Sequence, residues 1–141
     1  MAERFELCVA VVLSEEGGYK PASPDDPGGE TNMGISARAH PSEDIKGMTR
    51  DRAMQIYRSE YWDGVKAYLM HPGLDLVVFD GAVMMGPATV VRQLQTCLGF
   101  SKKDRVGHVG PKTKETIAKL SAAQVRSTIT KMVSARMKYQ S

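Results

Sequence analysis

The sequence predicts a mainly α-helical domain of about six helices around one loop-rich segment. Three observations support this fold class. Apolar residues recur at helical spacing along most of the chain, glycine and proline are concentrated between residues 17 and 34, and helix-end signals separate the apolar stretches. The 141 residues are 42% apolar and 25% charged, the composition of one globular domain with at most a small second lobe.

The first helix is predicted over residues 5–13, where apolar residues follow the i, i+3, i+4, i+7, i+8 pattern of one buried face. Gly17 and Gly18 are expected to end it, because glycine readily adopts the left-handed conformation found after helices. The segment from Gly17 to Gly34 contains five glycines and three prolines. It therefore predicts a loop with a short β-hairpin near residues 28–35.

The second helix is expected to begin after Thr49, a typical N-cap residue, with Asp51 in its first turn. Its apolar face consists of Ala53, Ile56, Tyr57 and Tyr61. A third helix is predicted over residues 74–85, a nearly continuous apolar stretch that is buried on most sides. Gly86 ends it, and Pro87 begins the next helix.

The fourth helix carries its apolar residues at Val90, Val91, Leu94 and Leu98, and Gly99 closes it. A charged loop over residues 102–110 leads to a short helix predicted over residues 111–120. Ser121 and Gln124 then have the spacing of a capping box that begins the last helix. The buried face of this helix is expected to contain Val125, Ile129, Met132, Val133 and Arg136.

Charge is distributed unevenly along the chain. Residues 1–80 contain fourteen acidic and eight basic residues, whereas residues 81–141 contain two acidic and eleven basic ones. The net charge of +3 is too small to indicate nucleic-acid binding by itself, but the basic rear half favours an anionic partner. A solvated basic face remains the alternative.

The sequence contains no candidate for a membrane span, a signal peptide, a metal site or a disulfide framework. The longest stretch without Lys, Arg, Asp or Glu covers residues 81–91, which is too short to cross a bilayer. The first residues carry acids where a signal peptide has bases. Two cysteines, Cys8 and Cys97, are expected as buried thiols. The three histidines lack metal-ligand spacing and are expected at the surface: His40, His71 and His108.

Glu16 interrupts the apolar pattern of the first helix. The spacing of the buried face places it on the apolar side at the helix end, whereas Glu15 faces water. A partly desolvated carboxyl keeps its proton more readily, as a general acid requires. The alternative is that Glu16 is a solvated carboxylate at a frayed helix end.

A second polar group follows in the loop. Asp25, Asp26 and Thr31 lie 9, 10 and 15 residues beyond Glu16. Glycoside hydrolysis generally uses two carboxyl groups across the sugar, one protonated and one ionised. The alternative is that the aspartates belong to an ordinary turn, since Asp-Pro-Gly is a common turn sequence.

Together, these residues resemble a family signature. Glu16-Gly17-Gly18-Tyr19, followed by residues 26–35 (DPGGETNMGI), is similar to the EGGY…DPGGxTxxGI signature of the glycoside hydrolase 108 family. Its members are N-acetylmuramidases, the lysozymes of phages and of bacterial secretion-activator proteins. Tyr61-Trp62 also resembles the family's Tyr-Trp at the end of a following helix.

The rear half resembles the peptidoglycan-binding region that accompanies this catalytic part. The similar positions are residues 79–83, 86–87, 94–95, 98–99, 104 and 109–113. The resemblance implies a mainly α, lysozyme-like fold whose loop and short β-hairpin carry part of the active site. It also implies a catalytic region over residues 1–75 and a peptidoglycan-binding region over residues 76–141, packed as one unit.

By resemblance, Glu16 is the catalytic acid, and Asp26 and Thr31 belong to the second catalytic position. There Asp26 would stabilise the charged transition state or orient water, and Thr31 would help hold that water. Asp25 is a rival for Asp26. The residues expected to bind substrate are Tyr19, Asn32, Tyr61 and Trp62. For the aromatic residues, core packing is the alternative role, favoured for Tyr57 and Tyr61; a buried structural carboxylate is favoured for Asp80.

The sequence departs from the family at three points. Met84 stands where the family usually has Asn after Phe-Asp-Gly-Ala-Val, and Arg105 replaces the glycine that commonly follows Asp104. The chain also stops at Ser141, before the aromatic-containing segment of the family, which indicates a shortened natural variant or a trimmed chain.

The sequence therefore predicts a muramidase that hydrolyses the β-1,4 bond between N-acetylmuramic acid and N-acetylglucosamine, without metal or cofactor. We expect a monomer made in the cytoplasm that acts in the periplasm or cell wall, with a holin-type or secretion partner. The alternative is a catalytically weakened peptidoglycan-binding or secretion-accessory module. A nucleic-acid binder is a third hypothesis that lacks a motif.

Overall fold

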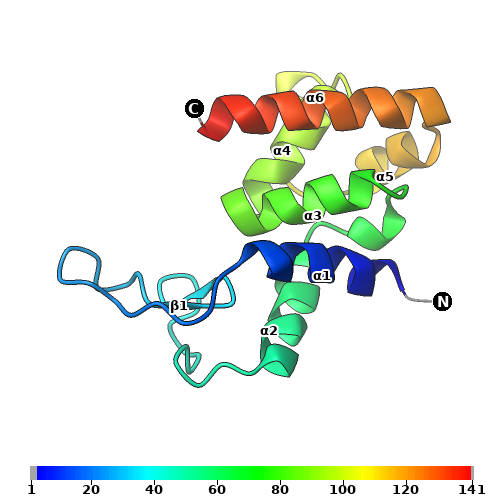
Figure 1. Ribbon diagram of the computed structural model, residues 1–141. Helices are drawn as coiled ribbons and strands as arrows, with labels where there is room; N and C mark the ends of the chain where they lie inside the picture. Colours follow the sequence, from blue (N-terminus) through cyan, green and yellow to red (C-terminus); the bar gives the residue numbers. More distant parts are fainter. Residues whose placement is uncertain (1–2, 141) are drawn as a thin grey trace. The chain divides into compact units, whose positions relative to one another are not determined.

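The computed structural model describes residues 3–140. The chain divides into two compact units, residues 1–57 and residues 58–141, and each is described separately. The described residues form six α-helices, one two-stranded antiparallel sheet and short π and 3-10 turns (Figure 1). This confirms the mainly α fold class with a short hairpin. Among the described residues, no helix is both long and apolar enough to span a bilayer.

The first unit begins with α1 (Arg4–Glu15). This helix buries Phe5, Cys8, Val9, Val12 and Leu13, as the apolar spacing predicts. It does not end at a left-handed glycine, however. Glu16 caps it with extended backbone (φ −94°, ψ 146°) and donates its N–H to Leu13 O over 3.3 Å. Neither Gly17 nor Gly18 has a positive φ, so the predicted mechanism of termination is wrong.

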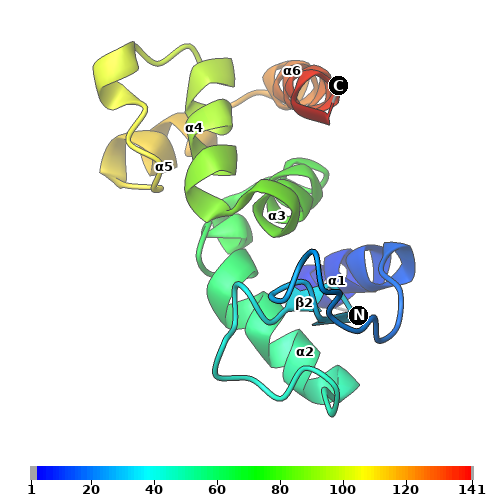
Figure 2. The same cartoon turned by 90° about the vertical axis from the view of Figure 1, so that its left-hand side faces the viewer.

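The hairpin consists of β1 (Thr31–Asn32) and β2 (Ile35–Ser36), paired antiparallel with Asn32 opposite Ile35 (Figures 1 and 2). The two residues between the strands, Met33 and Gly34, have φ values of 50° and 80°. Two successive positive φ values are the geometry of a type I′ turn, which matches the twist of a hairpin. Lys20 extends the pairing, because it exchanges two backbone hydrogen bonds with Thr31.

The last helix of the first unit is α2 (Arg50–Ile56). The Thr49 hydroxyl accepts the N–H of Arg52 over 3.1 Å, which confirms the predicted N-cap. The helix continues without a break into η1 (Tyr57–Trp62), a π-helical turn, and the division between the two units falls at its first residue. The predicted apolar residues Ala53, Ile56 and Tyr57 are buried, whereas Tyr61 is half-buried.

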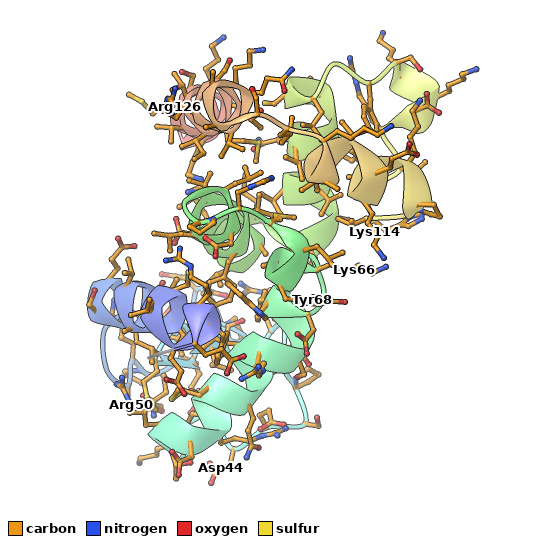
Figure 3. The ribbon with its side chains drawn as sticks, turned by 90° about the vertical axis from the view of Figure 1, so that its right-hand side faces the viewer. Asp44, Arg50, Lys66, Tyr68, Lys114 and Arg126 are labelled. Carbon is orange, nitrogen blue, oxygen red and sulfur yellow. The ribbon has the colours of Figure 1, made fainter. Side chains whose placement is uncertain are left out.

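The second unit contains η2 (Ala67–Leu69), α3 (Leu74–Met85), α4 (Pro87–Cys97), η3 (Lys102–Asp104), α5 (Pro111–Ala118) and α6 (Ala122–Gln140). Its core lies where α3 packs against α4 and α6. Figures 2 and 3 show α6 on one side of α4 and α5 on the other.

The predicted helix boundaries of this unit are confirmed at Gly86, Pro87 and Gly99, whereas α5 ends at Ala118 and not at residue 120. Gly86 has φ +91° and Pro87 begins α4. Gly99, with φ +86°, donates its N–H to Thr96 O, and Phe100 N–H reaches Gln95 O, both over 3.0 Å. This pair of bonds is a Schellman motif. The capping box before α6 is also formed, by reciprocal bonds between Ser121 and Gln124 of 2.8 and 3.1 Å.

The buried face of α6 differs in part from the prediction. Val125 and Met132 are buried as expected and Ile129 is half-buried, but Thr128 is buried in place of Val133, which is exposed. Arg136 lies on this face because it pairs with Asp80 of α3, with Nη1 2.7 Å from Oδ2.

The glycine that follows Asp80 makes room for this ion pair. A Cβ atom on Gly81 would lie 2.6 Å from the Arg136 Nη2 atom and would also overlap Val90. This supports a structural role for Asp80.

The histidine and cysteine side chains differ in how far they are buried. His40 is buried and His71 half-buried, with its Nε2 3.2 Å from Ile117 O; only His108 is exposed. The expectation of three surface histidines is therefore wrong for His40, whose surroundings in the loop after β2 could not be inferred from spacing. Cys8 is buried as expected, whereas Cys97 is only half-buried, and neither cysteine is in a disulfide.

The Asp80–Arg136 pair generates a stability prediction. Arg136→Gln leaves the half-buried Asp80 carboxylate without its ion-pair partner, so the free energy of unfolding should fall by about 1–3 kcal/mol. The matched control is Arg126→Gln on the exposed face of the same helix (Figure 3), which should change it by less than about 0.5 kcal/mol. Urea unfolding measures both, and equal losses would show that the pair contributes nothing specific.

Candidate active site

The two halves of the sequence signature meet in the first unit. Glu16 follows α1, and Gly34 lies in the turn between β1 and β2, eighteen positions later in the chain. A Cβ atom on Gly34 would lie 2.9 Å from both Cγ and Cδ of Glu16. The Glu16 side chain therefore lies directly against the hairpin turn, at a distance that only glycine permits.

Tyr57 holds this turn in place. Its side chain is fully buried, and its hydroxyl donates to the Met33 carbonyl over 2.7 Å. The same hydroxyl would overlap a Cβ atom on Gly34. Core packing was the favoured interpretation of Tyr57, and the burial agrees with it. Its contact with the hairpin turn was missed, because nothing in the helical spacing indicates where a buried hydroxyl points.

The environment of Glu16 corrects one expectation. Glu16 is exposed and lies one residue beyond α1, whereas the spacing predicted a partly desolvated carboxyl on the apolar face. The extended backbone at Glu16 takes its side chain out of the helical register, so the projection of the face from Leu13 fails there. The carboxyl is open to a large ligand approaching from solvent.

Asp26 lies in a tightly turned loop before the hairpin. Its N–H is bonded to both the carbonyl and the hydroxyl of Ser23, and its carbonyl accepts the N–H of Gly29 over 3.0 Å. The carboxylate is half-exposed and pairs with the guanidinium of Arg38. Asp25 is exposed. In the described part of the chain, no hydrogen bond joins Asp26 to Glu16.

Thr31 begins β1, and its backbone pairs with Lys20 on one side and Ser36 on the other. Its side chain is half-buried. Glu16 and Thr31 are thus both held by the hairpin, one at its turn and one at its open end, while Asp26 is carried by the loop that leads into it.

The two residues of this unit that are predicted to bind substrate differ in exposure and in their hydrogen bonds within the protein. The Tyr19 hydroxyl donates to Glu30 Oε1 over 2.7 Å, which raises the pKa of the Tyr19 phenol, and its ring remains exposed. Lys46 Nζ lies 5.9 Å from that ring. Asn32 is buried, and its amide donates to the carbonyls of Ile45 and Lys46. These bonds give Asn32 a structural role, and its contact with substrate stays a prediction.

Tyr61 and Trp62 belong to the second unit. Tyr61 is half-buried, and desolvation, assisted by the charge of Glu60, raises the pKa of its phenol. Trp62 is only 2% exposed and packs edge-to-face on Phe79, with the ring centroids 5.4 Å apart. This burial favours the core-packing alternative for Trp62 over stacking on a sugar.

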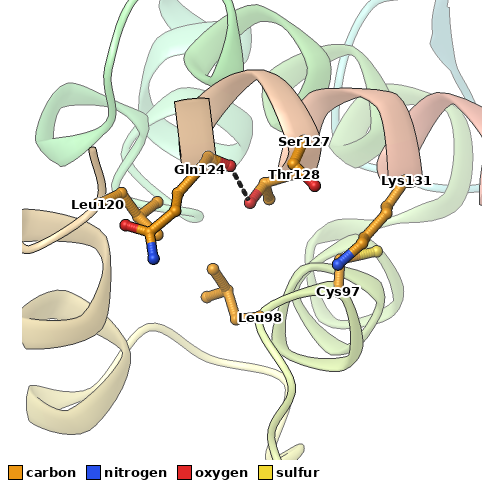
Figure 4. A pocket seen from close by; sticks show the side chains of 7 residues that line it. All are labelled: Cys97, Leu98, Leu120, Gln124, Ser127, Thr128 and Lys131. Carbon is orange, nitrogen blue, oxygen red and sulfur yellow. Dashed lines mark hydrogen bonds between the residues drawn. The ribbon is translucent and has the colours of Figure 1, made fainter. Parts of the chain in front are cut away.

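Two cavities of the described residues lie in the second unit, and Glu16, Asp26 and Thr31 line neither. One, of about 160 Å³, lies between the end of α4 and the first turns of α6 (Figure 4). Cys97 and Lys131 both line it, and Figure 4 draws them at the same side; burial raises the pKa of the Cys97 thiol, and the Lys131 ammonium opposes that shift. The other, of about 190 Å³, is formed by the loop between α4 and α5.

The close approach at Gly34 generates a prediction. Gly34→Ala forces a side chain into a left-handed conformation and against Tyr57 and Glu16, so the free energy of unfolding should fall by at least about 1–2 kcal/mol. Gly18→Ala is the control, since a Cβ atom there meets nothing within 4 Å. Thermal and urea unfolding measure both, and a Gly34→Ala protein as stable as the Gly18→Ala protein would contradict this packing.

Comparison with known proteins places this site in a family. The sequence model of the Glycosyl hydrolase 108 family matches residues 9–86, which include Glu16, the hairpin and Tyr57. A solved structure of SagA from Brucella abortus is similar, with a TM-score of 0.77 and 32% sequence identity, over 95% of this chain and 79% of that chain. No curated protein gives a match. The match over more than half of the chain, together with the signature residues gathered at the hairpin, shows that this protein belongs to the glycosyl hydrolase 108 family.

Proposed function

We propose that this protein is an N-acetylmuramidase that hydrolyses the β-1,4 bond between N-acetylmuramic acid and N-acetylglucosamine, with Glu16 as the general acid. The observation that carries the proposal is the contact between the Glu16 side chain and Gly34. It places an exposed carboxyl on a turn that the buried Tyr57 hydroxyl fixes. A rigid support of this kind is what a catalytic side chain needs.

The general acid must give a proton to the glycosidic oxygen as the bond breaks. Glu16 is open to solvent, so a glycan strand can reach it without a rearrangement of the core. In this proposal a bound strand covers the Glu16 carboxyl and excludes water from it.

The second catalytic position is proposed at Asp26 and Thr31. Asp26 presents a half-exposed carboxylate whose direction is set by Arg38 and by the turn at Gly29. It would stabilise positive charge on the sugar ring or orient the attacking water, and the Thr31 hydroxyl would help hold that water. Among residues 3–140, no hydrogen bond or ion pair anchors the Asp25 side chain, which favours Asp26 of the two.

A second candidate function is a wall-binding or secretion-accessory module with weak or no catalysis. Met84 favours it, because it places an exposed thioether on α3 where the family usually carries an amide. Such a module would bind to insoluble peptidoglycan without releasing reducing ends from it. Access to the wall through a holin-type or secretion partner, and action as a monomer, are proposed on the sequence alone.

The role of Glu16 is tested by Glu16→Gln, which keeps the size of the side chain and removes the acid. Release of reducing ends from purified peptidoglycan should fall by about 10²–10⁴-fold. Glu15→Gln is the matched control, since Glu15 is the exposed last residue of α1, and it should retain the parent rate. Equal rates for the two variants would rule out Glu16 as the acid, and a parent that binds walls without releasing reducing ends would favour the accessory module.

The choice between the two aspartates is tested separately. Asp26→Asn should lower the rate of reducing-end release by at least about tenfold, whereas Asp25→Asn should stay within about twofold of the parent. Circular dichroism checks that the loop variants keep the fold. If Asp25→Asn lowers the rate of reducing-end release more than Asp26→Asn does, Asp25 and not Asp26 is the second catalytic carboxylate.

A further inference from the structure

The loop between α4 and α5 is long and irregular, yet it is held firmly. It runs from Leu98 to Gly110 and contains only the short turn η3. Loops of this length within a compact domain are commonly functional. We therefore ask which contacts hold the loop in this conformation and which function the conformation serves.

A buried glutamine makes several of the contacts that hold the loop. Gln95 of α4 is 0% exposed, and its side chain makes three bonds to the loop and to α5. Its Oε1 accepts the N–H of Gly107 over 3.1 Å, and its Nε2 donates to His108 O over 3.0 Å and to Thr113 Oγ1 over 3.2 Å. A fully satisfied buried amide of this kind fixes one loop conformation.

Lys66 provides a second anchor. Its side chain is labelled in Figure 3. Its Nζ donates to the carbonyl of Val109 over 2.9 Å, and its backbone adopts a left-handed conformation with φ +54°. That conformation is unfavourable for a residue with a side chain. Arg105 is a third anchor of the loop, because its Nε donates to Phe100 O over 3.0 Å. Buried polar groups and backbone strain are thus both used to keep this loop in one shape.

The shape that results is the cavity of about 190 Å³. Its walls are mainly apolar and come from Phe100, Val106 and Pro111. At the rim, Lys112 Nζ lies 5.0 Å from the centre of the Phe100 ring and 2.7 Å from Asp104 Oδ2. The bonds from Lys112 and from Ser101 keep the pKa of the Asp104 carboxyl below its ordinary value.

The size and charge of the cavity restrict its ligand. Its volume is below the roughly 300–1,000 Å³ of common small-molecule sites, which excludes a pair of sugars. Lys112 is largely exposed and has two ammonium N–H groups left after its bond to Asp104. Asp104 also lines the cavity, whereas the basic residues Lys102, Lys103 and Arg105 lie on the same loop outside its lining. The remaining ammonium donors of Lys112 beside an apolar wall fit a small apolar group that carries an anion.

We propose that this cavity binds the peptide stem of peptidoglycan, through a methyl-bearing residue and its carboxylate. The carboxylate would accept hydrogen bonds from the Lys112 ammonium, and the methyl group would lie against Phe100 and Val106. The proposal rests on the proposed function, because it assumes a peptidoglycan substrate. It adds a second contact, to the peptide and not the glycan, on the unit that does not carry Glu16.

Amide NMR of the full chain tests the proposal with D-alanyl-D-alanine and with a stem tetrapeptide as probes. Both should shift the amides of Gly107, Val109 and Lys112. Lys112→Gln should weaken binding about tenfold, the effect of losing a hydrogen bond to a charged group. Lys114→Gln removes the same charge from the same helix outside the cavity and should bind as the parent does. Val106→Asp, at an exposed position, should weaken binding by like-charge repulsion without a folding defect.

The outcomes separate this proposal from the one on catalysis. The stem-peptide site is overturned if the peptides leave these amides unchanged, if acetate shifts them equally, or if peptide-free glycan strands shift them instead. Reducing-end release by the parent is measured in parallel. Release with no peptide binding removes only the stem-peptide site, whereas peptide binding by a parent that releases no reducing ends keeps that site and removes the muramidase assignment.

Discussion

The hydrogen bond from the buried Tyr57 hydroxyl to the Met33 carbonyl is the interaction on which the candidate active site depends. It fixes a turn whose two central residues both have positive φ, and so it sets where Gly34 presents an open face to Glu16. A side chain at Gly34 would break both contacts at once. The exposed carboxyl thus owes its position to Tyr57, the buried first residue of η1. The surface chemistry of this unit is set from its core.

In the second unit, too, polar side chains hold elements together that lie far apart in the sequence. Arg136 crosses from α6 to Asp80 through the space that Gly81 leaves, and Gln95 ties the loop after α4 to α5. The Asp80 carboxylate pairs with Arg136 Nη1, and the Gln95 amide makes three hydrogen bonds, so these groups keep partners away from solvent. The Asp80–Arg136 pair joins α3 to α6, and the Gln95 bonds join α4 to the loop and to α5.

Helix positions followed from the sequence because their signals are local. Thr49, Pro87, Gly99 and the capping box before α6 act within four residues of where they stand, and the structure confirms each. The end of α1 was placed correctly but for the wrong reason, since Glu16 leaves the helix in extended conformation. Contacts between distant residues could not be inferred in this way. The contact of Tyr57 with the turn, the burial of His40 and the three bonds of Gln95 depend on which segments meet in space, and helical periodicity carries no such information. Glu16 itself was singled out by its spacing and by the signature, not by its environment.

The surroundings of the two thiols bear on how the protein responds to oxidation. Disulfide exchange and oxidation proceed through the thiolate, and oxidising compartments modify exposed cysteines first. Cys8 is shielded inside α1, and burial raises the pKa of Cys97 despite the nearby Lys131 ammonium. Cys8 is therefore inaccessible, and burial makes the Cys97 thiol less ready to lose its proton than an exposed thiol. Neither cysteine is in a disulfide, so this fold needs no oxidation step to form.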